Sequence, residues 1–474
     1  MKNRKINSSY LLILSFFALA LTASCTKWLD VKPEDKFTKE QMYQSKQSVQ
    51  ELVNGFYLNL GNTNLYGGNL TLTALDAIAQ RYQIMSSDSY YYPFVNRNYS
   101  QASVDATIST IWGQMYLTLA NINDFVLILP TVNNGLTQEE KNLFLGEAIG
   151  LRAFIHFDLL RMFGKPYDET SKSEEAIPYY RNLSTNIEDF ISSEQVVVNI
   201  LEDIAEAEKL LENDPITSQS GTTNNNNNRF NLYAVKALKA RVYQWIGDKP
   251  MAAQTAKEVI AVQSKFPWVT HAAATTINND TDRKFFTEII FGAFNPKLYD
   301  VYRDNFDGNL LPSSVLSTGS GEFVDKVYES YEADYRYKPS WSVGNSGITF
   351  KTFTKYSDLA NKENKSRFIV PVIRISEMYY IVAESTEDSA EALQYLNTVR
   401  QKRNIINDVT DATRLQTELT KEYQKEFYGE GQLWYYYKRN KMTSIPSMNS
   451  NWSNITISLN DYVFPIPITE KNGR

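Results

Sequence analysis

The sequence predicts a mainly α-helical protein in which paired helices pack against one irregular, loop-rich region, with few short strands. Three observations support this prediction. Over most of the chain, apolar residues recur at steps of three and four, which is the period of an amphipathic helix. Two such stretches begin with a capping box. By contrast, residues 263–366 follow no regular period and are rich in Gly, Asn, Asp, Ser and aromatic residues, as loops are.

The start of the chain differs in composition from the rest. Basic residues precede an apolar run, Leu11 to Leu21, which is shorter than the about 20 residues that a membrane-spanning helix needs. Small residues follow, and then Cys25, the only cysteine. This order predicts a lipoprotein signal peptide over residues 1–24 and lipidation at Cys25, although a strict signal would have Leu in place of Thr22. The alternative is an ordinary signal peptide, but a free thiol is a liability in an oxidising compartment.

Charge and cysteine content disfavour several classes of protein. The net charge is −6 at pH 7, and no basic run is present. Such a chain is a poor candidate for binding nucleic acid or an anionic membrane surface. If Cys25 carries lipid, no disulfide can form and packing must stabilise the fold. We expect residues 25–474 to form a single domain, with a mainly helical body at 25–262 and 367–474.

The helices expected in the first half of the chain follow from their apolar stripes and their ends. They lie at residues 41–60, 71–85, 104–129 and 139–163. Thr137 and Glu140 are placed to form the capping box of the last of these, and Gly164 ends it. Because this helix is apolar almost all round, we expect it to be central. Its histidine, His156, is expected to be a core residue with satisfied hydrogen bonds.

A helix pair in the middle of the chain indicates the architecture. A capping box at Ser192 opens one helix, which stops before Pro215. Beyond it, helical stripes at 232–245 and 252–260 flank the tight turn 247–250, with small residues where the helices meet. The pair resembles a tetratricopeptide unit, in which helix pairs stack into a continuous core. Helices resume at 374–385, 389–403 and 415–428, followed by a short strand at 455–459.

Aromatic residues gather in two stretches that lack a helical period. One is residues 86–103, which we expect to be an exposed loop, and the other is the ligand-side region 263–366. A stretch as long as the second without regular structure is usually functional. Exposed rings can cover the apolar face of a sugar or pack against a peptide. The residues expected to bind a ligand are therefore Arg81, Tyr90, Tyr91, Tyr92, Asn96, Trp268, Tyr302 and Trp341.

These rings can instead pack the loops onto the helical body, because aromatic side chains are mostly buried. The two alternatives differ in their consequences. If the rings contact a ligand, Tyr91→Ala and Trp341→Ala weaken binding with little loss of stability. If the rings belong to the core, the same changes lower the melting temperature strongly.

No motif in the sequence indicates catalysis, a metal or a cofactor. The two histidines, His156 and His271, form no ligand pattern, and P-loop, Rossmann, HExxH, CxxC and GxSxG patterns are absent. We therefore expect no catalytic residue, no metal site and no cofactor. One alternative is a lipid-anchored glycoside hydrolase that uses two carboxylates such as Glu426 and Glu430. Another is a helical-repeat scaffold that binds only protein.

Several stretches, taken together, resemble the SusD/RagB family of nutrient-binding outer-membrane lipoproteins. They are, in order, CTKWLDVKP at 25–33, IWGQMYLTLAN at 111–121, LRAFIHFDLLRMFG at 151–164, RISEMYYIVAE at 374–384, LNTVRQKR at 396–403, EFYGEG at 426–431 and YVFPIP at 462–467. The chain departs from the family pattern after residue 431, where Leu433 and Tyr436 replace an Arg and an Asp. Any one stretch is a weak signal, but their order over almost the whole chain is a strong one.

The resemblance implies a body of tetratricopeptide-like helix pairs and a less regular region that carries the binding surface. It implies a nutrient ligand, most of all an oligosaccharide or other glycan, with peptide as the alternative. It also implies a partner, a SusC-like TonB-dependent outer-membrane transporter, which the lipoprotein covers as a lid. The protein is then expected at the outer membrane, anchored through Cys25 and facing the cell exterior.

Overall fold

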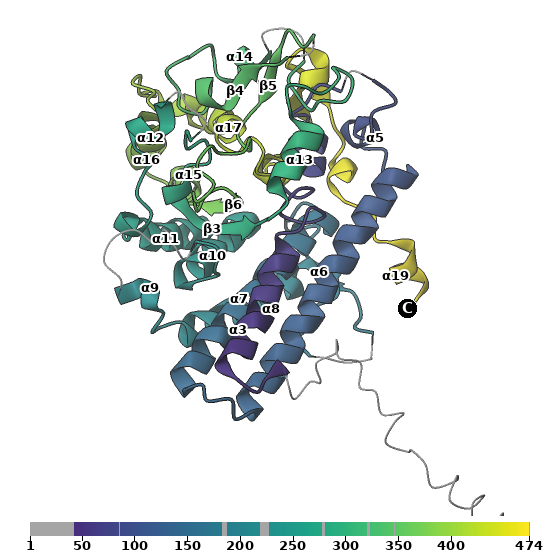
Figure 1. Ribbon diagram of the computed structural model, residues 1–474, viewed down its shortest axis with the longest axis vertical. Helices are drawn as coiled ribbons and strands as arrows, with labels where there is room; N and C mark the ends of the chain where they lie inside the picture. Colours follow the sequence, from purple (N-terminus) through teal and green to yellow (C-terminus); the bar gives the residue numbers. More distant parts are fainter. Residues whose placement is uncertain are drawn as a thin grey trace, which may run out of the picture.

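The computed structural model describes residues 42–84, 86–182, 187–218, 227–276, 280–319, 323–345 and 347–473. Helices dominate these residues, and the short strands pair two by two (Figure 1). The predicted mainly α fold class is therefore confirmed. The predicted signal peptide and Cys25 lie outside the described residues. Among the helices within those ranges, none is long and apolar enough to cross a membrane.

Long helices of the N-terminal half form the lower part of the molecule in Figure 1. The elements of this half are α3 (Lys46–Leu60), α4 (Ala74–Ile78), α5 (Tyr92–Val95), α6 (Ala102–Ile128), α7 (Gln138–Phe163), β1 (Glu175–Ile177), β2 (Ile191–Ser192), α8 (Ser193–Leu210) and α9 (Pro215–Ser218). The predicted capping box of α7 is present, since Oγ1 of Thr137 accepts the N–H of Glu140 at 3.2 Å. From Leu145 to Phe163 every residue of α7 except Glu147 is buried. The helix is central, as predicted.

The predicted helix pair in the middle of the chain is formed by α10 (Leu232–Ile246) and α11 (Lys249–Ile260). Gly247 ends α10 at φ +80°, a conformation that favours glycine, and Oδ1 of Asp248 accepts the N–H of Met251 to cap α11. Helix α11 also packs against α15 (Ile375–Ser385), which pairs with α16 (Ser389–Lys402). The helical stack thus continues across the long segment between α11 and α15.

That long segment is closed by an antiparallel pair, β3 (Ile289–Phe294) and β6 (Ile369–Arg374). It is more regular than its lack of a period predicts. It contains α12 (His271–Thr275), α13 (Leu298–Asn305) and α14 (Phe323–Val327), and the antiparallel strands β4 (Trp341–Val343) and β5 (Lys351–Phe353). Elements of this length are too short for a hydrophobic period to show in the sequence, which explains the difference.

The C-terminal part ties back to the N-terminal half. It comprises α17 (Leu415–Glu426), α18 (Gln432–Arg439), the hairpin of β7 (Ser444–Ser447) and β8 (Ser453–Thr456), and α19 (Ile468–Asn472), so the predicted strand starts and ends earlier than expected. Between α17 and α18, the N–H groups of Gly429 and Gly431 donate to the carboxylate of Asp76 at 2.6 and 3.1 Å. Gly431 has φ +70°, and a Cβ there would lie 2.1 Å from the carbonyl oxygen of Leu70. Only glycine fits this approach.

The two residues that depart from the family pattern belong to the core. Leu433 and Tyr436 are 0 % and 2 % exposed. The ring of Tyr436 stacks on that of Tyr423 in α17, with centroids 4.1 Å apart. Further along α18, Nζ of Lys438 donates to the carbonyl oxygens of Arg161 and Gly164, both at 2.6 Å, and so caps the end of α7. Packing and this cap hold α18 against the central helix.

Candidate functional site

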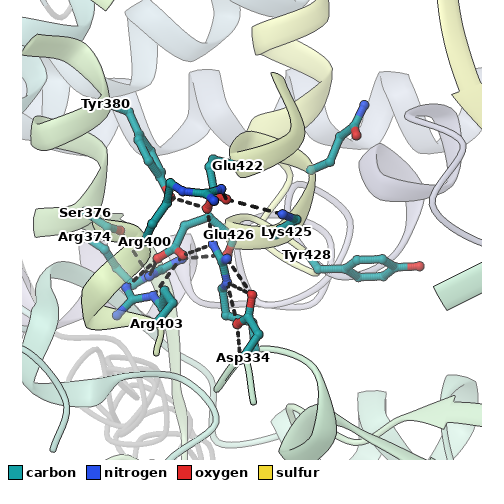
Figure 2. A network of polar contacts seen from close by, with 12 residues as sticks. Asp334, Arg374, Ser376, Tyr380, Arg400, Arg403, Glu422, Lys425, Glu426 and Tyr428 are labelled. Carbon is teal, nitrogen blue, oxygen red and sulfur yellow. Dashed lines mark hydrogen bonds and ion pairs between the residues drawn. The ribbon is translucent and has the colours of Figure 1, made fainter. Parts of the chain in front are cut away.

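The carboxylates considered for a hydrolase, Glu426 and Glu430, belong to a buried network of ion pairs, part of which is shown in Figure 2. Nη2 of Arg403 donates to Glu426 at 2.6 Å, and Nη2 of Arg374 lies 3.0 Å from Glu430. Burial disfavours ionisation of Glu426, but Arg403 and Arg374 outweigh it and hold the pKa of its carboxyl well below the usual range. Both carboxylates are 2 % exposed. They are therefore not placed to act on a sugar from either side of its glycosidic bond.

A cleft of about 750 Å³ opens in the segment between α11 and α15. Its walls come from α12, α13, the turn before β4 and the loop after α16. The volume lies within the range of small-molecule sites. Its lining includes His271, Arg283, Tyr302, Asp334, Tyr335, Lys338, Trp341 and Asn404. The segment that the sequence marks as the ligand side thus contains a cavity of ligand size.

Tyr302 and Trp341 are the predicted ligand residues that line this cleft. They are only 8 % and 6 % exposed. The indole of Trp341 packs against Phe353 and Tyr428, with centroids 4.9 Å away in both cases. The expectation that these two rings stand out on exposed loops is therefore wrong, because neighbouring rings cover most of their surface. Each offers the cleft only a small part of its side chain.

The polar side chains of the cleft are not identified from the sequence. Nδ1 of His271 lies 2.8 Å from the hydroxyl of Tyr335. Arg283 is half-buried. Its Nε donates to the carbonyl oxygen of Pro339 at 2.7 Å, and its Nη1 donates to Oγ of Ser357 at 3.2 Å. The only sequence signal for these residues is that they lie in or beside the aromatic-rich segment.

Asp334 connects the cleft to the network of Figure 2. It is 1 % exposed and accepts a hydrogen bond from Nη2 of Arg336 at 2.7 Å. Nη1 of Arg336 donates in turn to Glu422 at 2.8 Å and to Glu426 at 3.0 Å. Burial alone would lower the pKa of Arg336, but Asp334 and Glu422 raise it well above its usual range. Charged groups inside the core thus hold one wall of the cleft.

The predicted residues of the tyrosine stretch lie together at α5, outside the cleft: Tyr90, Tyr91, Tyr92 and Asn96. All but Tyr91 are exposed, Tyr90 by 52 % and Tyr92 by 42 %. The hydroxyl of Tyr91 donates to Oδ1 of Asn305 in α13 at 2.9 Å. Helix α13 also carries Tyr302, so it links this tyrosine cluster to the cleft.

Arg81 and Trp268 have other surroundings. Arg81 is 0 % exposed, its guanidinium carbon lies 3.8 Å from the ring centroid of Tyr428, and its Nη2 donates to the carbonyl oxygen of Gln424. The expectation that Arg81 faces a ligand is therefore wrong, because stacking on Tyr428 places it in the core. Trp268 is half-buried and packs against Tyr379, with centroids 5.1 Å apart, and it does not line the cleft.

Other hollows lie among the helices of the N-terminal half. One of about 410 Å³ lies between α3 and α6, and one of about 610 Å³ lies beside α3 and α7. None of the predicted ligand residues lines either hollow. The cleft between α12, α13 and β4 is therefore the candidate site.

Known proteins resemble this chain over most of its length. A family model described as "Starch-binding associating with outer membrane" matches residues 27–244, and the SusD family model matches residues 236–463. SusD-like protein P38 of Formosa agariphila is 22 % identical over 92 % of this chain and 91 % of its own. A solved SusD-like carbohydrate binding protein of Bacteroides vulgatus is 16 % identical and covers 91 % of this chain and 96 % of its own, with a TM-score of 0.69. A SusD superfamily protein of Bacteroides thetaiotaomicron is 19 % identical and covers 90 % and 98 %, with a TM-score of 0.68.

At such identities the solved structures establish the fold alone, and the family models carry the assignment. The two models overlap and together run from residue 27 to residue 463. They include five of the stretches quoted above in full, among them the buried helix at 151–164 and the glycine turn at 426–431, and they cover part of the other two. The fold, the two family models and these stretches agree that the chain belongs to the SusD/RagB family.

Proposed function

We propose that this protein binds an oligosaccharide in the cleft between α12, α13 and β4 and delivers it to a SusC-like TonB-dependent outer-membrane transporter. Membership of the SusD/RagB family supports a role in nutrient binding at the outer membrane. A fold relative from Bacteroides vulgatus is described as a carbohydrate binding protein, which favours a glycan over a peptide. The observation that carries the proposal is the cleft of about 750 Å³, in which two aromatic rings and several polar groups converge.

The lining of the cleft suits a sugar ring. The exposed parts of Tyr302 and Trp341 supply apolar contact for its C–H groups. His271, Ser342 and Asn404 supply donors and acceptors for its hydroxyl groups. Because the carboxylates Glu426 and Glu430 are buried in ion pairs, we propose capture without cleavage.

The proposed membrane attachment is a lipid on Cys25, after removal of residues 1–24. A single acyl chain binds membranes only marginally, so stable anchoring requires more than one. We propose that the residues between Cys25 and Met42, the first described residue, serve as a tether. In this proposal the body covers the transporter and moves on its tether to admit the ligand.

The test is calorimetric titration of the chain from Thr26 onward against a panel of oligosaccharides and a panel of mixed peptides, with each mixture examined for breakdown products. Saturable binding of one class of sugar without products is the expected result. Binding of peptides alone would mean that the ligand is a peptide and not a sugar. Breakdown products of the sugar would favour the hydrolase. If neither panel binds, the capture proposal fails and the protein-binding scaffold is favoured.

A further inference from the structure

Arg283 is a cation of the cleft that has no acidic partner among the described residues. Two other arginines inside the fold do have one: Arg152 faces Asp203 at 2.7 Å, and Arg403 faces Glu288 at 2.6 Å. The neighbouring carboxylate, Asp282, accepts the backbone N–H groups of residues 284 and 286 instead. Arg283 therefore meets the cleft without a contact from any described acidic residue that would compensate its charge.

The guanidinium of Arg283 is also held in a fixed orientation. Nε is fixed by the carbonyl oxygen of Pro339, and Nη1 by the hydroxyl of Ser357. Nη2 has no hydrogen-bond acceptor within the described part of the chain. A fixed guanidinium with free N–H groups is a strong binding element for a carboxylate or sulfate, since little conformational entropy remains to be lost.

The other charged groups of the cleft are neutralised by partners. Asp334 is paired with Arg336, and the exposed Lys338 lies 3.6 Å from Glu332. Burial lowers the pKa of Arg283, and the nearby Tyr302 and Asp282 do not make up for it. An anion beside Arg283 would supply the missing negative charge.

Resting on the proposed sugar-binding function, we infer that the cleft selects an oligosaccharide with an anionic substituent, a uronic carboxylate or a sulfate ester, which Arg283 binds. Tyr302 and Trp341 line the same cleft, so the ring of such a sugar can lie against an aromatic side chain while its anion meets the guanidinium. A charge-assisted hydrogen bond of this kind corresponds to roughly ten- to a hundredfold in affinity.

The experiment compares sugars that differ only in charge. Oligomers containing galacturonate, mannuronate or glucuronate are titrated beside their methyl esters, and sulfated galactan oligomers beside their desulfated forms. We expect at least one acidic member to bind at least tenfold tighter than its neutral counterpart. Preference within the uronate pairs assigns the anion as a carboxylate, and preference within the galactan pairs assigns it as a sulfate.

Matched variants assign that preference to one residue. Arg283→Gln is expected to abolish the acid preference while affinity for the neutral counterpart stays within about twofold. The control is Arg303→Gln on α13, because Arg303 is exposed, lies outside the cleft and is paired with Asp300 and Asp304. The Arg303→Gln protein should keep the preference for acidic over neutral sugars. Arg283→Lys should keep part of it, because the charge remains but the planar fork is lost.

Three results would overturn the inference. Neutral sugars that bind as tightly as acidic ones would leave the proposed function intact and remove the role of Arg283. An acid preference that survives in a folded Arg283→Gln protein would place the anion elsewhere. If no sugar binds, whether acidic or neutral, both the inference and the proposed function are rejected.

Discussion

Nη2 of Arg336 donates to Oδ2 of Asp334 over 2.7 Å, and this pair joins the wall of the cleft to the ion network of the core. Asp334 lines the cleft, whereas Arg336 also binds Glu422 and Glu426 of α17. A loop wall that lines the cleft is thereby fixed to a helix. The preorganisation of the cleft depends on this pair, because loops without such contacts have many accessible conformations.

Arg336→Ala should destabilise the fold by about 3–5 kcal/mol, since it leaves Asp334, Glu422 and Glu426 without a buried counter-charge. Chemical denaturation measures this loss. The control is Arg303→Ala, whose ion pairs are about half exposed and should contribute less than about 1 kcal/mol. Equal, small losses in both variants would show that the network does not hold the fold.

Gly431→Ala should cost more stability than Gly247→Ala. Both glycines have positive φ, +70° and +80°, so each alanine pays roughly 1–2 kcal/mol for the left-handed backbone. At Gly247 no atom of the described residues lies within 4 Å of the added Cβ, whereas at Gly431 the carbonyl oxygen of Leu70 lies 2.1 Å away. The free energies of unfolding of the two variants, measured with urea, should therefore differ by roughly 1–3 kcal/mol. Equal free energies would mean that the turn relaxes away from Leu70.

His156 should make the fold sensitive to acid. Its Nδ1–H donates to the carbonyl oxygen of Arg152 at 2.9 Å, and its Nε2 accepts the N–H of Tyr180 at 3.2 Å, which fixes the neutral tautomer. Burial lowers the pKa of His156 from 6.5 to about 3. Between these values the unfolded chain binds the proton and the folded chain does not, so stability falls as the pH drops from 6.5 towards 3.

The measurement is the urea midpoint at several pH values in that window. His156→Gln should flatten the decline, although its stability at neutral pH is lower because the stacking of His156 on Tyr179 is lost. The only other histidine, the exposed His271, gives the matched control, and His271→Gln should retain the decline. A decline unchanged by His156→Gln would assign it to other groups.

Trp341→Ala and Tyr90→Ala should differ in stability. Trp341 is 6 % exposed between Phe353 and Tyr428, so its removal should cost about 3–5 kcal/mol. Tyr90 is 52 % exposed and its hydroxyl lies 2.7 Å from that of Thr107, so its removal should cost about 1 kcal/mol. Thermal melts measure both. A strong loss for Tyr90→Ala would show that the tyrosine cluster at α5 is part of the core.

The long helices were predictable because their signals are local. The capping box of Thr137 and Glu140 and the unbroken apolar composition predict α7, and the turn at Gly247 predicts the pair α10 and α11. Strands β3 and β6 were missed, because they pair segments far apart in the chain and a short apolar run is equally compatible with a helix.

The site was predictable only as a region. The aromatic-rich segment does contain the cleft, and Tyr302 and Trp341 do line it. Burial, however, depends on partners distant in sequence: Arg81 lies in the core because Tyr428 lies beneath it. Arg283 carries no local signal at all, since the role that we infer for it rests on Pro339 and Ser357, which orient it, and on the lack of an acidic contact among the described residues.

The central claim is that an oligosaccharide binds in the cleft between α12, α13 and β4. A crystal structure of the protein with its tightest-binding oligosaccharide tests this claim most directly. The predicted result is a sugar ring within about 4 Å of Tyr302 or Trp341. A sugar seated on Tyr90 and Tyr92 at α5, or between α3 and α6, with the cleft empty, would contradict it.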